Sequence, residues 1–333
     1  MTSVAWASII NLTIGFAVPL LLVALGGMYS ERSGVINIAL DGIMIIGALA
    51  SCLVLRAMDL AGWGETLMKG QLGLLIAVLV AGVSGMVFSL LLAFAAINLK
   101  ADQTIGGTAL NIFAPAFSVV IAWAIQGQGL TDIAIPKWAT LTYKDFGISG
   151  SVKTDFFPAL FKKFYITIPI AIILLVVAWF VLYRTRFGLR LRACGEHPQA
   201  ADSVGINVYK MRYSGVMISG FLGGIGGLAY VLVAGTSFTG DVAGYGFLAL
   251  AVMIFGNWNP GRILFSAIFF ALFKVVGTSH SLFPFLPQFS GVKEVSCLYN
   301  LIPYIFTLIL LIFTSKKSRA PKAEGIPYDK GQR

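Results

Sequence analysis

The chain has 333 residues, of which 58% are hydrophobic and only 11% are charged, and its mean hydropathy is +0.87. A soluble domain carries about 25% charged residues, because its surface must be hydrated. The composition therefore excludes an ordinary soluble protein and indicates that lipid surrounds most of the chain. The net charge of +10 has to be read against the position of the charges relative to a membrane.

Long apolar segments follow one another along the chain, separated by charged or Pro/Gly-rich stretches. A helix needs about 20 apolar residues to cross a bilayer. We predict an all-α polytopic membrane protein with about nine transmembrane helices, within a range of eight to ten, because the seventh segment is short and typical of a broken helix. The nine segments are 5–28, 35–55, 72–97, 105–125, 165–183, 213–234, 245–255, 262–279 and 298–314.

The distribution of Lys and Arg predicts the orientation. The first segment has no basic residue before Arg32, so it is interpreted as a retained span and not as a signal peptide. If the polar stretch 184–212 is cytoplasmic, nine crossings place the N-terminus outside and the C-terminus inside. The inner segments then hold 15 Lys and Arg residues and the outer segments 8. The basic balance is thus a topology signal, and no nucleic-acid partner is expected.

The predicted organisation is a single transmembrane domain, residues 1–314, followed by a basic cytoplasmic tail, residues 315–333. The tail is expected to be solvated and largely disordered. An outer loop at 126–164 contains several aromatic residues and is expected to face away from the cytoplasm.

Glycines at 220–227 form two interleaved pairs, four residues apart. The stretch 224–229 also matches GxGxxA, but a dinucleotide site needs a preceding strand and a soluble βαβ unit. Inside an apolar segment, small residues at this spacing let helix backbones approach closely. The glycines assigned to helix packing are Gly220, Gly223, Gly224 and Gly227.

Residues for covalent or metal chemistry are missing from the sequence. There is no GxxxxGK[ST] motif for ATP phosphates. The three cysteines are far apart in no CxxC arrangement, and His197 and His280 have no ligand-spaced partner. We therefore predict no catalytic residue, no metal and no cofactor bound by this chain, and the protein is not expected to be an enzyme.

Polar residues within predicted spans are the remaining candidates for function. Asn37 and Asp41 lie four residues apart at the start of the second segment, so on a helix they share a face. Asp41 is either a structural partner of Arg32, Ser33 or another span, or a residue of a transport path. Asn111 suits an interhelical hydrogen bond, with ligand contact as the alternative.

The most distinctive polar stretch is 187–207. Pro198 can open a short helix, Glu196 lies near the positive end of that helix, and Gly205 can end it. A short amphipathic helix in a basic loop suits a groove of a soluble partner, and it can pass motion to the spans on either side. A loop lying on anionic lipid headgroups is the alternative, but it does not explain the defined helix ends.

These residues resemble a known family. The pattern Gly188, Arg192, Gly195, Pro198, Ala200, Ala201 and Gly205 resembles the coupling loop of permease subunits of bacterial ATP-binding-cassette importers, in the group with ribose-type and branched-chain amino-acid permeases. Residues 24–42 and 101–111, and more loosely 244–261, resemble the nucleoside-type branch. That branch has Glu in place of Asp41 and a more regular segment at 256–260, and both differences bear on the substrate.

The resemblance implies a permease fold in the bacterial inner membrane and a division of labour. An extracytoplasmic lipoprotein would capture the substrate, this chain and a related permease would form the path as a heterodimer within membrane lipid, and cytoplasmic ATPases would bind ATP and Mg²⁺. The outer loop would face the lipoprotein. The expected coupling residues are Gly188, Arg192, Gly195, Glu196, Pro198, Ala200, Ala201 and Gly205, and the expected substrate-path residues are Asn37, Asp41, Asn111 and Phe113.

Alternatives remain open at this stage. The same mechanism can serve a sugar or a branched-chain amino acid in place of a nucleoside. A secondary transporter driven by an ion gradient would use Asp41 as its coupling acid. An intramembrane enzyme lacks a catalytic set in the sequence.

Overall fold

The computed structural model describes residues 3–152, 154–235, 237–279 and 319–331, together with residues 301, 305 and 309. These residues are mostly helical, and seven of the described helices are long and apolar enough to cross a membrane. The prediction of an all-α polytopic membrane protein is confirmed, whereas the count of about nine spans is not. The ninth predicted segment, 298–314, lies almost entirely outside the described residues, as does His280.

The long helices correspond to seven of the predicted segments, and the short seventh segment is the 11-residue helix α10. The long helices are α1 (Ser3–Arg32), α2 (Leu40–Leu60), α3 (Leu67–Ala93), α4 (Gln103–Gln126), α6 (Thr167–Arg184), α9 (Val208–Ala234) and α11 (Pro260–Thr278). The shorter elements are η1 (Trp63–Glu65), η2 (Phe94–Asn98), β1 (Ile133–Ala134), η3 (Lys137–Ala139), α5 (Phe156–Leu160), α7 (Arg186–Glu196), α8 (Pro198–Ser203), β2 (Ser237–Phe238) and α10 (Tyr245–Phe255).

Polar side chains fix where several helices begin. A side-chain oxygen accepts hydrogen bonds from first-turn backbone N–H groups at the start of α4, α9 and α11; the capping residues are Asp102, Asn207 and Asn259, respectively. Such caps satisfy donors that have no partner inside the helix. Between the caps the sequences are apolar on most sides, as required of helices that contact both lipid and protein.

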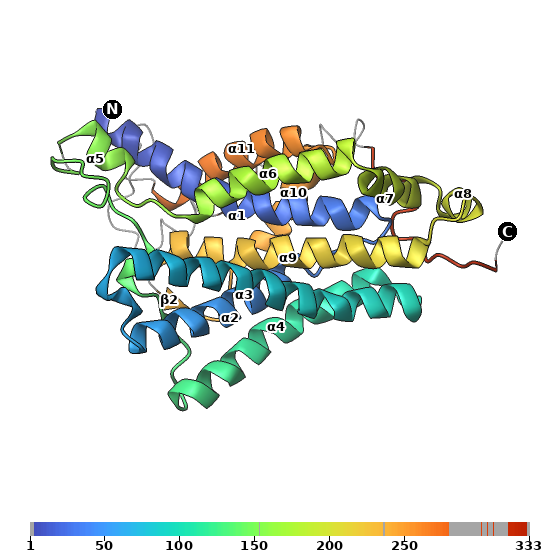
Figure 1. The fold of residues 1–333 in the computed structure, drawn as a ribbon, viewed down its shortest axis with the longest axis horizontal. Helices are drawn as coiled ribbons and strands as arrows, with labels where there is room; N and C mark the ends of the chain where they lie inside the picture. The colour runs from blue at the N-terminus through green and yellow to red at the C-terminus, as the bar shows by residue number, and fades with distance from the viewer. Residues whose placement is uncertain are drawn as a thin grey trace.

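Helix α9 occupies the centre of the bundle and packs against α1, α2 and α3 (Figure 1). A Cβ atom on Gly224 would overlap the carbonyl oxygen of Ala81 in α3, and one on Gly227 would overlap the carbonyl oxygen of Met44 in α2. Lipid is as apolar as a leucine side chain, so helices in a bilayer associate largely through close van der Waals contact. The bundle therefore depends on the glycines of α9.

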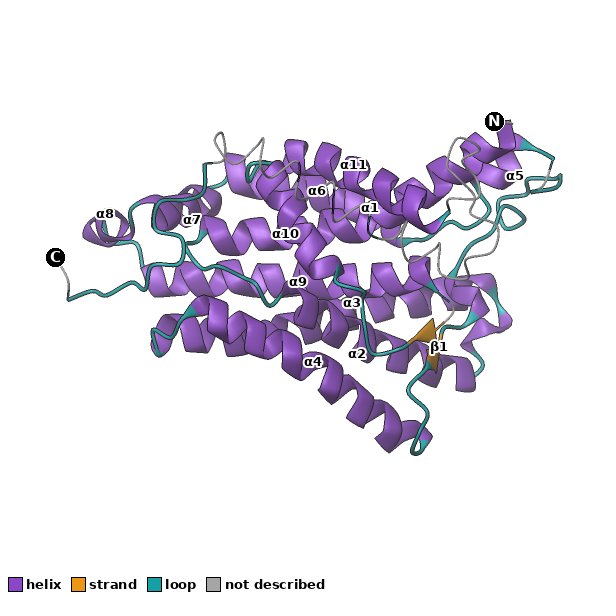
Figure 2. Ribbon diagram, turned by 180° about the vertical axis from the view of Figure 1, so that it is seen from behind, coloured by secondary structure: helices purple, strands orange, loops and turns teal. Residues whose placement is uncertain are grey.

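The two ends of the molecule carry different elements. The N-terminus and α5 lie at one end of the long axis, and α7, α8 and the C-terminus lie at the opposite end (Figure 1). Near the N-terminal end, β1 pairs with β2 in an antiparallel ribbon, with Ile133 opposite Phe238 (Figure 2). This pairing joins the loop after α4 to the segment that follows α9.

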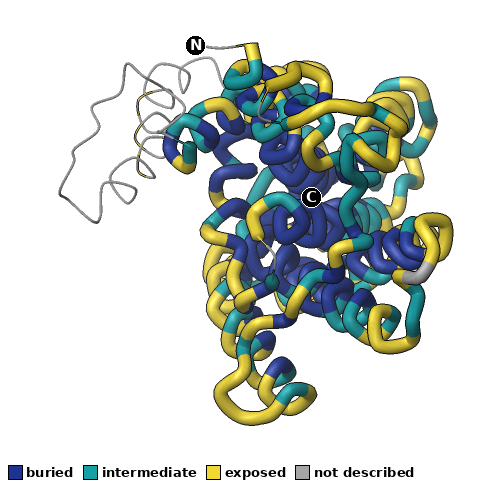
Figure 3. Tube along the Cα trace, turned by 90° about the vertical axis from the view of Figure 1, so that its left-hand side faces the viewer, coloured by how far each residue is buried: buried dark blue, intermediate teal, exposed yellow. Residues whose placement is uncertain are grey.

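Burial is concentrated along the central helices, and the peripheral helices are exposed (Figure 3). Most residues of α1 and α9 are buried, whereas most residues of α4 and α6 are not. Helix α4 also diverges from the bundle towards its C-terminal end (Figure 1). Its exposed apolar side chains include Ile112, Phe113, Phe117, Val120 and Trp123.

The second predicted segment was placed too early in the chain. Residues 33–39 are not helical, and α2 begins at Leu40, so the prediction that Asn37 and Asp41 share a helix face is wrong. The cause is Gly34, which has φ +96° and ends α1. The N–H groups of Gly34 and Val35 bond back to the carbonyls of Glu31 and Ser30, respectively, in a C-terminal capping arrangement that requires a left-handed residue.

Two further corrections concern the C-terminal end of the molecule. The predicted short helix is present as α8, with Pro198 in its first turn and Gly205 at φ +81° two residues after its last residue, Ser203. The sequence reasoning missed α7, which precedes it. The prediction of a solvated, disordered tail is wrong for residues 319–331, because Ala323 and Tyr328 are only 6% and 5% exposed and the segment bonds to several elements.

Candidate transport site

Two interrupted segments meet inside the bundle. Helix α2 begins at Leu40 after the non-helical stretch 33–39, and α10 begins at Tyr245 after the stretch that follows β2. The buried Asp41 side chain accepts a hydrogen bond from the Gly246 N–H at 2.8 Å, so a carboxylate from α2 satisfies the first turn of α10. Helices broken within the membrane are a recurring feature of transporter sites.

The Asn111 side chain from α4 fixes the beginning of α2. Its Oδ1 accepts from the Gly42 N–H at 2.8 Å, and its Nδ2 donates to the Ile38 carbonyl at 2.8 Å. The buried Asn37 donates to Ser219 Oγ of α9 at 2.8 Å. Three of the four predicted path residues therefore make hydrogen bonds within the protein that hold the interrupted segments in place.

The fourth predicted path residue, Phe113, is half exposed and lies in an aromatic stack. Its ring centroid is 6.3 Å from that of Phe88 in α3 and 5.4 Å from that of Phe117. The stack borders a cavity of about 410 Å³ between α2, α3 and α4. This face offers a flat apolar surface to a solute or to a neighbouring subunit.

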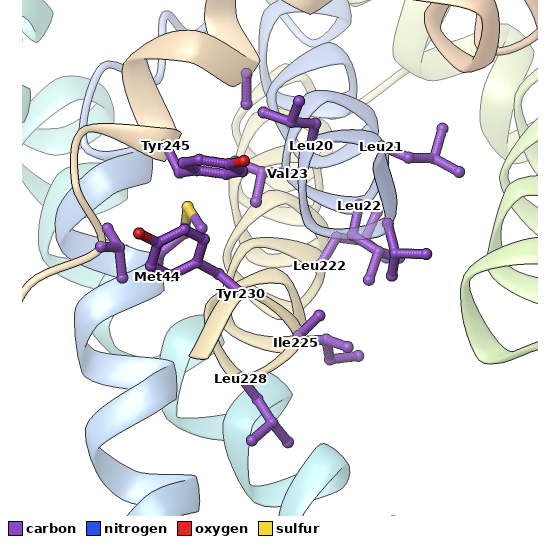
Figure 4. Packing of buried hydrophobic residues seen from close by; sticks show 14 of the residues in the cluster. Leu20, Leu21, Leu22, Val23, Met44, Leu222, Ile225, Leu228, Tyr230 and Tyr245 are labelled. Carbon is purple, nitrogen blue, oxygen red and sulfur yellow. The ribbon is translucent and has the colours of Figure 1, made fainter. Parts of the chain in front are cut away.

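Aromatic side chains also surround the beginning of α10. The rings of Tyr230 and Tyr245 have centroids 4.4 Å apart, with Met44 beside them (Figure 4). The Lys274 ammonium lies 5.6 Å from the centroid of the Tyr245 ring, a cation–π distance. Reasoning from the sequence did not connect these residues, because they lie on four different helices, α2, α9, α10 and α11.

The predicted coupling residues lie on α7, α8 and the turn after α8. Gly188 packs so tightly on the end of α6 that a Cβ atom would overlap the carbonyl oxygens of Val181 and Leu182. The Arg192 guanidinium lies 5.0 Å from the centroid of the Tyr183 ring. Helix α7 is thus fixed to α6 at a sharp bend.

The far end of α7 contacts α1. A Cβ atom on Gly195 would overlap the carbonyl oxygen of Arg32, and the Arg32 Nη1 lies 4.0 Å from Glu196 Oε1. Beyond it, Pro198 and Ala201 are buried, whereas Ala200 is exposed, so α8 presents one face to the protein and one to solvent. Burial raises the pKa of the Cys194 thiol to about 11, so this thiol is neutral at physiological pH.

The glycines assigned to helix packing line two sides of α9. A Cβ atom on Gly220 would overlap Ser89 Oγ of α3, and one on Gly223 would lie 2.9 Å from Ile43 Cγ2 of α2. Gly224 and Gly227 make the backbone contacts described above. Within the residues that the structure describes, no group of three or more His, Cys, Asp or Glu side chains gathers as a metal site would require.

The fold is that of an all-α polytopic membrane protein, and comparison with known proteins identifies its class. A family described as the permease component of branched-chain amino acid transport systems matches residues 9–315, so the chain belongs to this permease family. No solved structure matches the chain.

Three relatives are similar to the chain over most of its length. The guanosine ABC transporter permease NupQ of Bacillus subtilis is 42% identical over 98% of this chain and 97% of its own length. The nucleoside ABC transporter permease NupC of Lactococcus lactis is 38% identical over 95% of both chains. The nucleoside ABC transporter permease NupB of the same Lactococcus strain is 24% identical over 95% of this chain and 84% of its own length.

Proposed function

We propose that this chain is the membrane-spanning permease subunit of an ATP-binding-cassette importer that brings nucleosides into the cytoplasm of a bacterium. The observation that carries the proposal is the 42% identity to a guanosine permease over 98% of the chain. A match of this length includes every described span, the coupling loop and the interrupted segments. The permease sits in the inner membrane, with its N-terminus outside and its C-terminus inside.

ATP hydrolysis takes place on a separate subunit, which binds ATP and Mg²⁺. Helix α8 is the surface on which that ATPase acts, because its buried Pro198 and Ala201 anchor it while Gln199 and Ala200 are exposed. A cavity of about 460 Å³ borders the turn after α8 and is lined by polar groups that include Asp202, Ser203 and Asn207. When the ATPase displaces α8, the contacts of Gly188 and Arg192 transmit the movement to α6, and the contact of Gly195 transmits it to α1. 

A second, related permease completes the path. The exposed apolar face of α4 supports this arrangement, and so does the pair of nucleoside permeases, NupB and NupC, in one Lactococcus strain. An extracytoplasmic substrate-binding lipoprotein docks on the loop 126–164, whose aromatic residues Phe146 and Phe157 are exposed.

The substrate passes the face that carries Phe113. The aromatic stack provides a surface for a nucleobase, and such stacking contributes about 1–3 kcal/mol per base. Asn37, Asp41 and Asn111 hold the adjoining interrupted segments, so their effect on the substrate is through the shape of the path. Weak binding suits an importer, since tight binding would trap the solute.

Uptake measurements test the proposal. A strain that carries this chain with its ATPase, second permease and lipoprotein should accumulate labelled guanosine and inosine, but not labelled ribose or branched-chain amino acids. Accumulation should stop when ATP is depleted and continue when ion gradients are dissipated. Uptake of ribose without nucleosides would contradict the substrate class, and uptake that follows the ion gradient would favour a secondary transporter.

A further inference from the structure

The C-terminal segment 319–331, here called the strap, lies across the end of the bundle between α7 and α9 (Figure 1). Although it is exposed at several positions, it places Ala323 and Tyr328 in buried sites, and Tyr328 contacts the Tyr209 ring of α9 with centroids 5.4 Å apart. A merely solvated tail would not bury these side chains. The strap is therefore part of the folded protein.

Hydrogen bonds attach the strap to separate elements. The Arg319 N–H donates to Asn257 Oδ1 at 3.0 Å in the turn between α10 and α11. The Ala323 N–H donates to the Gly195 carbonyl of α7 at 2.8 Å. The buried Arg212 of α9 donates from Nη1 to the Ile326 carbonyl at 2.9 Å. 

A fourth attachment reaches the connection between α3 and α4. There Lys100 Nζ lies 2.8 Å from Asp329 Oδ2. Both side chains are substantially exposed, so this ion pair contributes little to stability compared with the buried attachments.

Beneath the strap, polar groups of α1 and the α10–α11 turn are connected. The Trp258 indole N–H donates to Glu31, whose carboxyl group also hydrogen-bonds that of Glu324 in the strap. Arg32 Nη2 donates to the Trp258 carbonyl at 3.1 Å. Close packing adds to these bonds, because a Cβ atom on Gly34 would lie 3.3 Å from the Ala323 carbonyl oxygen.

The connected elements include both ends of α10. Its C-terminal end leads directly into the turn that contains Trp258, and its N-terminal end receives the Asp41 carboxylate from α2. A displacement at α7 thus has a continuous set of packed contacts to follow, from Gly195 through the strap and the Trp258 turn to α10. Contiguous packing of this kind can carry coupling between distant sites, provided that the elements move together.

We propose that the strap is a positioning element, which joins α7 to α1, α9 and the α10–α11 turn so that displacement of α8 by the ATPase reaches the contact between α2 and α10. This inference rests on the proposed function. It assigns to residues 319–331 a role in converting ATP hydrolysis into transport.

The experiment reconstitutes the complete importer in liposomes and measures nucleoside uptake and ATP hydrolysis in parallel. The variant Ala323→Pro removes the N–H that bonds to Gly195, because proline has no backbone donor. The matched control is Ala320→Pro, at an exposed strap residue for which the structure gives no hydrogen bond of the N–H. A chain that ends after residue 318 removes the whole strap.

In the Ala323→Pro variant and the truncated chain, we expect the ATP hydrolysed per nucleoside to rise at least about tenfold, as befits lost coupling, while the ATPase still copurifies. Ala320→Pro should keep the wild-type ratio. An unchanged ratio in both strap variants would overturn the inference. If the truncated chain does not assemble, Ala323→Pro decides the matter. If the wild-type importer itself moves no nucleoside, the proposed function fails, a result distinct from failure of the strap.

Discussion

Gly224 has no side chain, and this allows α9 to pack directly against two neighbouring helices. Its α carbon lies against the backbones of α2 and α3 at once, because Gly47 and Gly85 provide matching gaps on those helices. The sequence spacing predicted close helix contact, but it did not indicate which helices approach. That information comes only from the bundle.

We expect Gly224→Ala to destabilise the protein by about 1–3 kcal/mol, since an added methyl group must overlap the Ala81 carbonyl oxygen. Thermal unfolding of the purified chain in detergent measures the change. The matched control is Gly106→Ala in α4, where the nearest atom to the added Cβ is 3.7 Å away and alanine should be neutral or stabilising. Equal midpoints for both variants would disprove the packing role.

Asp41 offers a second test at the residue scale, because its carboxylate acts as a hydrogen-bond acceptor for Gly246. Asp41→Asn keeps an acceptor oxygen, so we expect its stability and nucleoside uptake to stay close to wild type. Asp41→Ala should lose about 1 kcal/mol, the usual cost of removing a helix cap. Thermal unfolding and uptake are measured on both. A stable Asp41→Asn chain without uptake would instead show that transport requires the ionisable carboxyl group of Asp41.

Among the elements, those bounded by strong local signals were predictable and those defined by tertiary contacts were not. Pro198 and Gly205 marked α8 correctly. Gly34 gave an equally good signal for the end of α1, but the mostly apolar residues from 35 onward were assigned to the second span and hid it. For the strap, the prediction rested on composition alone, because its basic, Pro-containing sequence is typical of a solvated tail. Its order comes from partners more than 60 residues away, such as Asn257 and Gly195.

The strap should also respond to pH through Glu324. Burial raises the pKa of this carboxyl group to about 7. A hydrogen bond with Glu31 and the positive charge of the nearby Arg32 act in the opposite direction and lower it. The docked strap then binds a proton more readily than the undocked strap, so docking is strongest below the ordinary carboxyl pKa. Docking of the strap weakens as the pH rises towards 7, and it changes no further once the pH is above the pKa of docked Glu324.

Hydrogen exchange of the Ala323 amide, corrected for the intrinsic pH dependence of exchange, measures this effect. Protection should be greater at pH 5 than at pH 8. Glu324→Gln should remove the difference, because the amide stays neutral at both values. The other charged or titratable groups near this joint, Glu31, Arg32, Glu196 and Arg212, are unchanged in that variant, and Glu31 is the one that hydrogen-bonds the replaced carboxyl group. A pH difference that survives Glu324→Gln would assign the titration to another group.

At the scale of the whole molecule, composition and hydropathy were enough for the fold class and for eight of the nine predicted segments, since lipid imposes one simple rule on every span. The candidate site was harder to predict from the sequence. Asn37, Asp41 and Asn111 were recognised as costly polar residues within spans, yet their partners Ser219, Gly246 and Gly42 depend on which helices adjoin. The Tyr230–Tyr245 pair had no sequence signal, because aromatic residues are frequent in all membrane spans.

The close packing of α9 at Gly220, Gly223, Gly224 and Gly227, here called the glycine seam, affects whether ions can leak through the subunit. Where helix backbones touch, as at Gly224 and Gly227, no file of water molecules can thread between them, so protons and small ions have no conducting route through that seam. We expect the interior of this subunit to insulate the membrane. If nucleosides pass the face that carries Phe113, as proposed, the contacts around Gly224 and Gly227 can stay closed during uptake, and the ion gradients across the membrane are maintained.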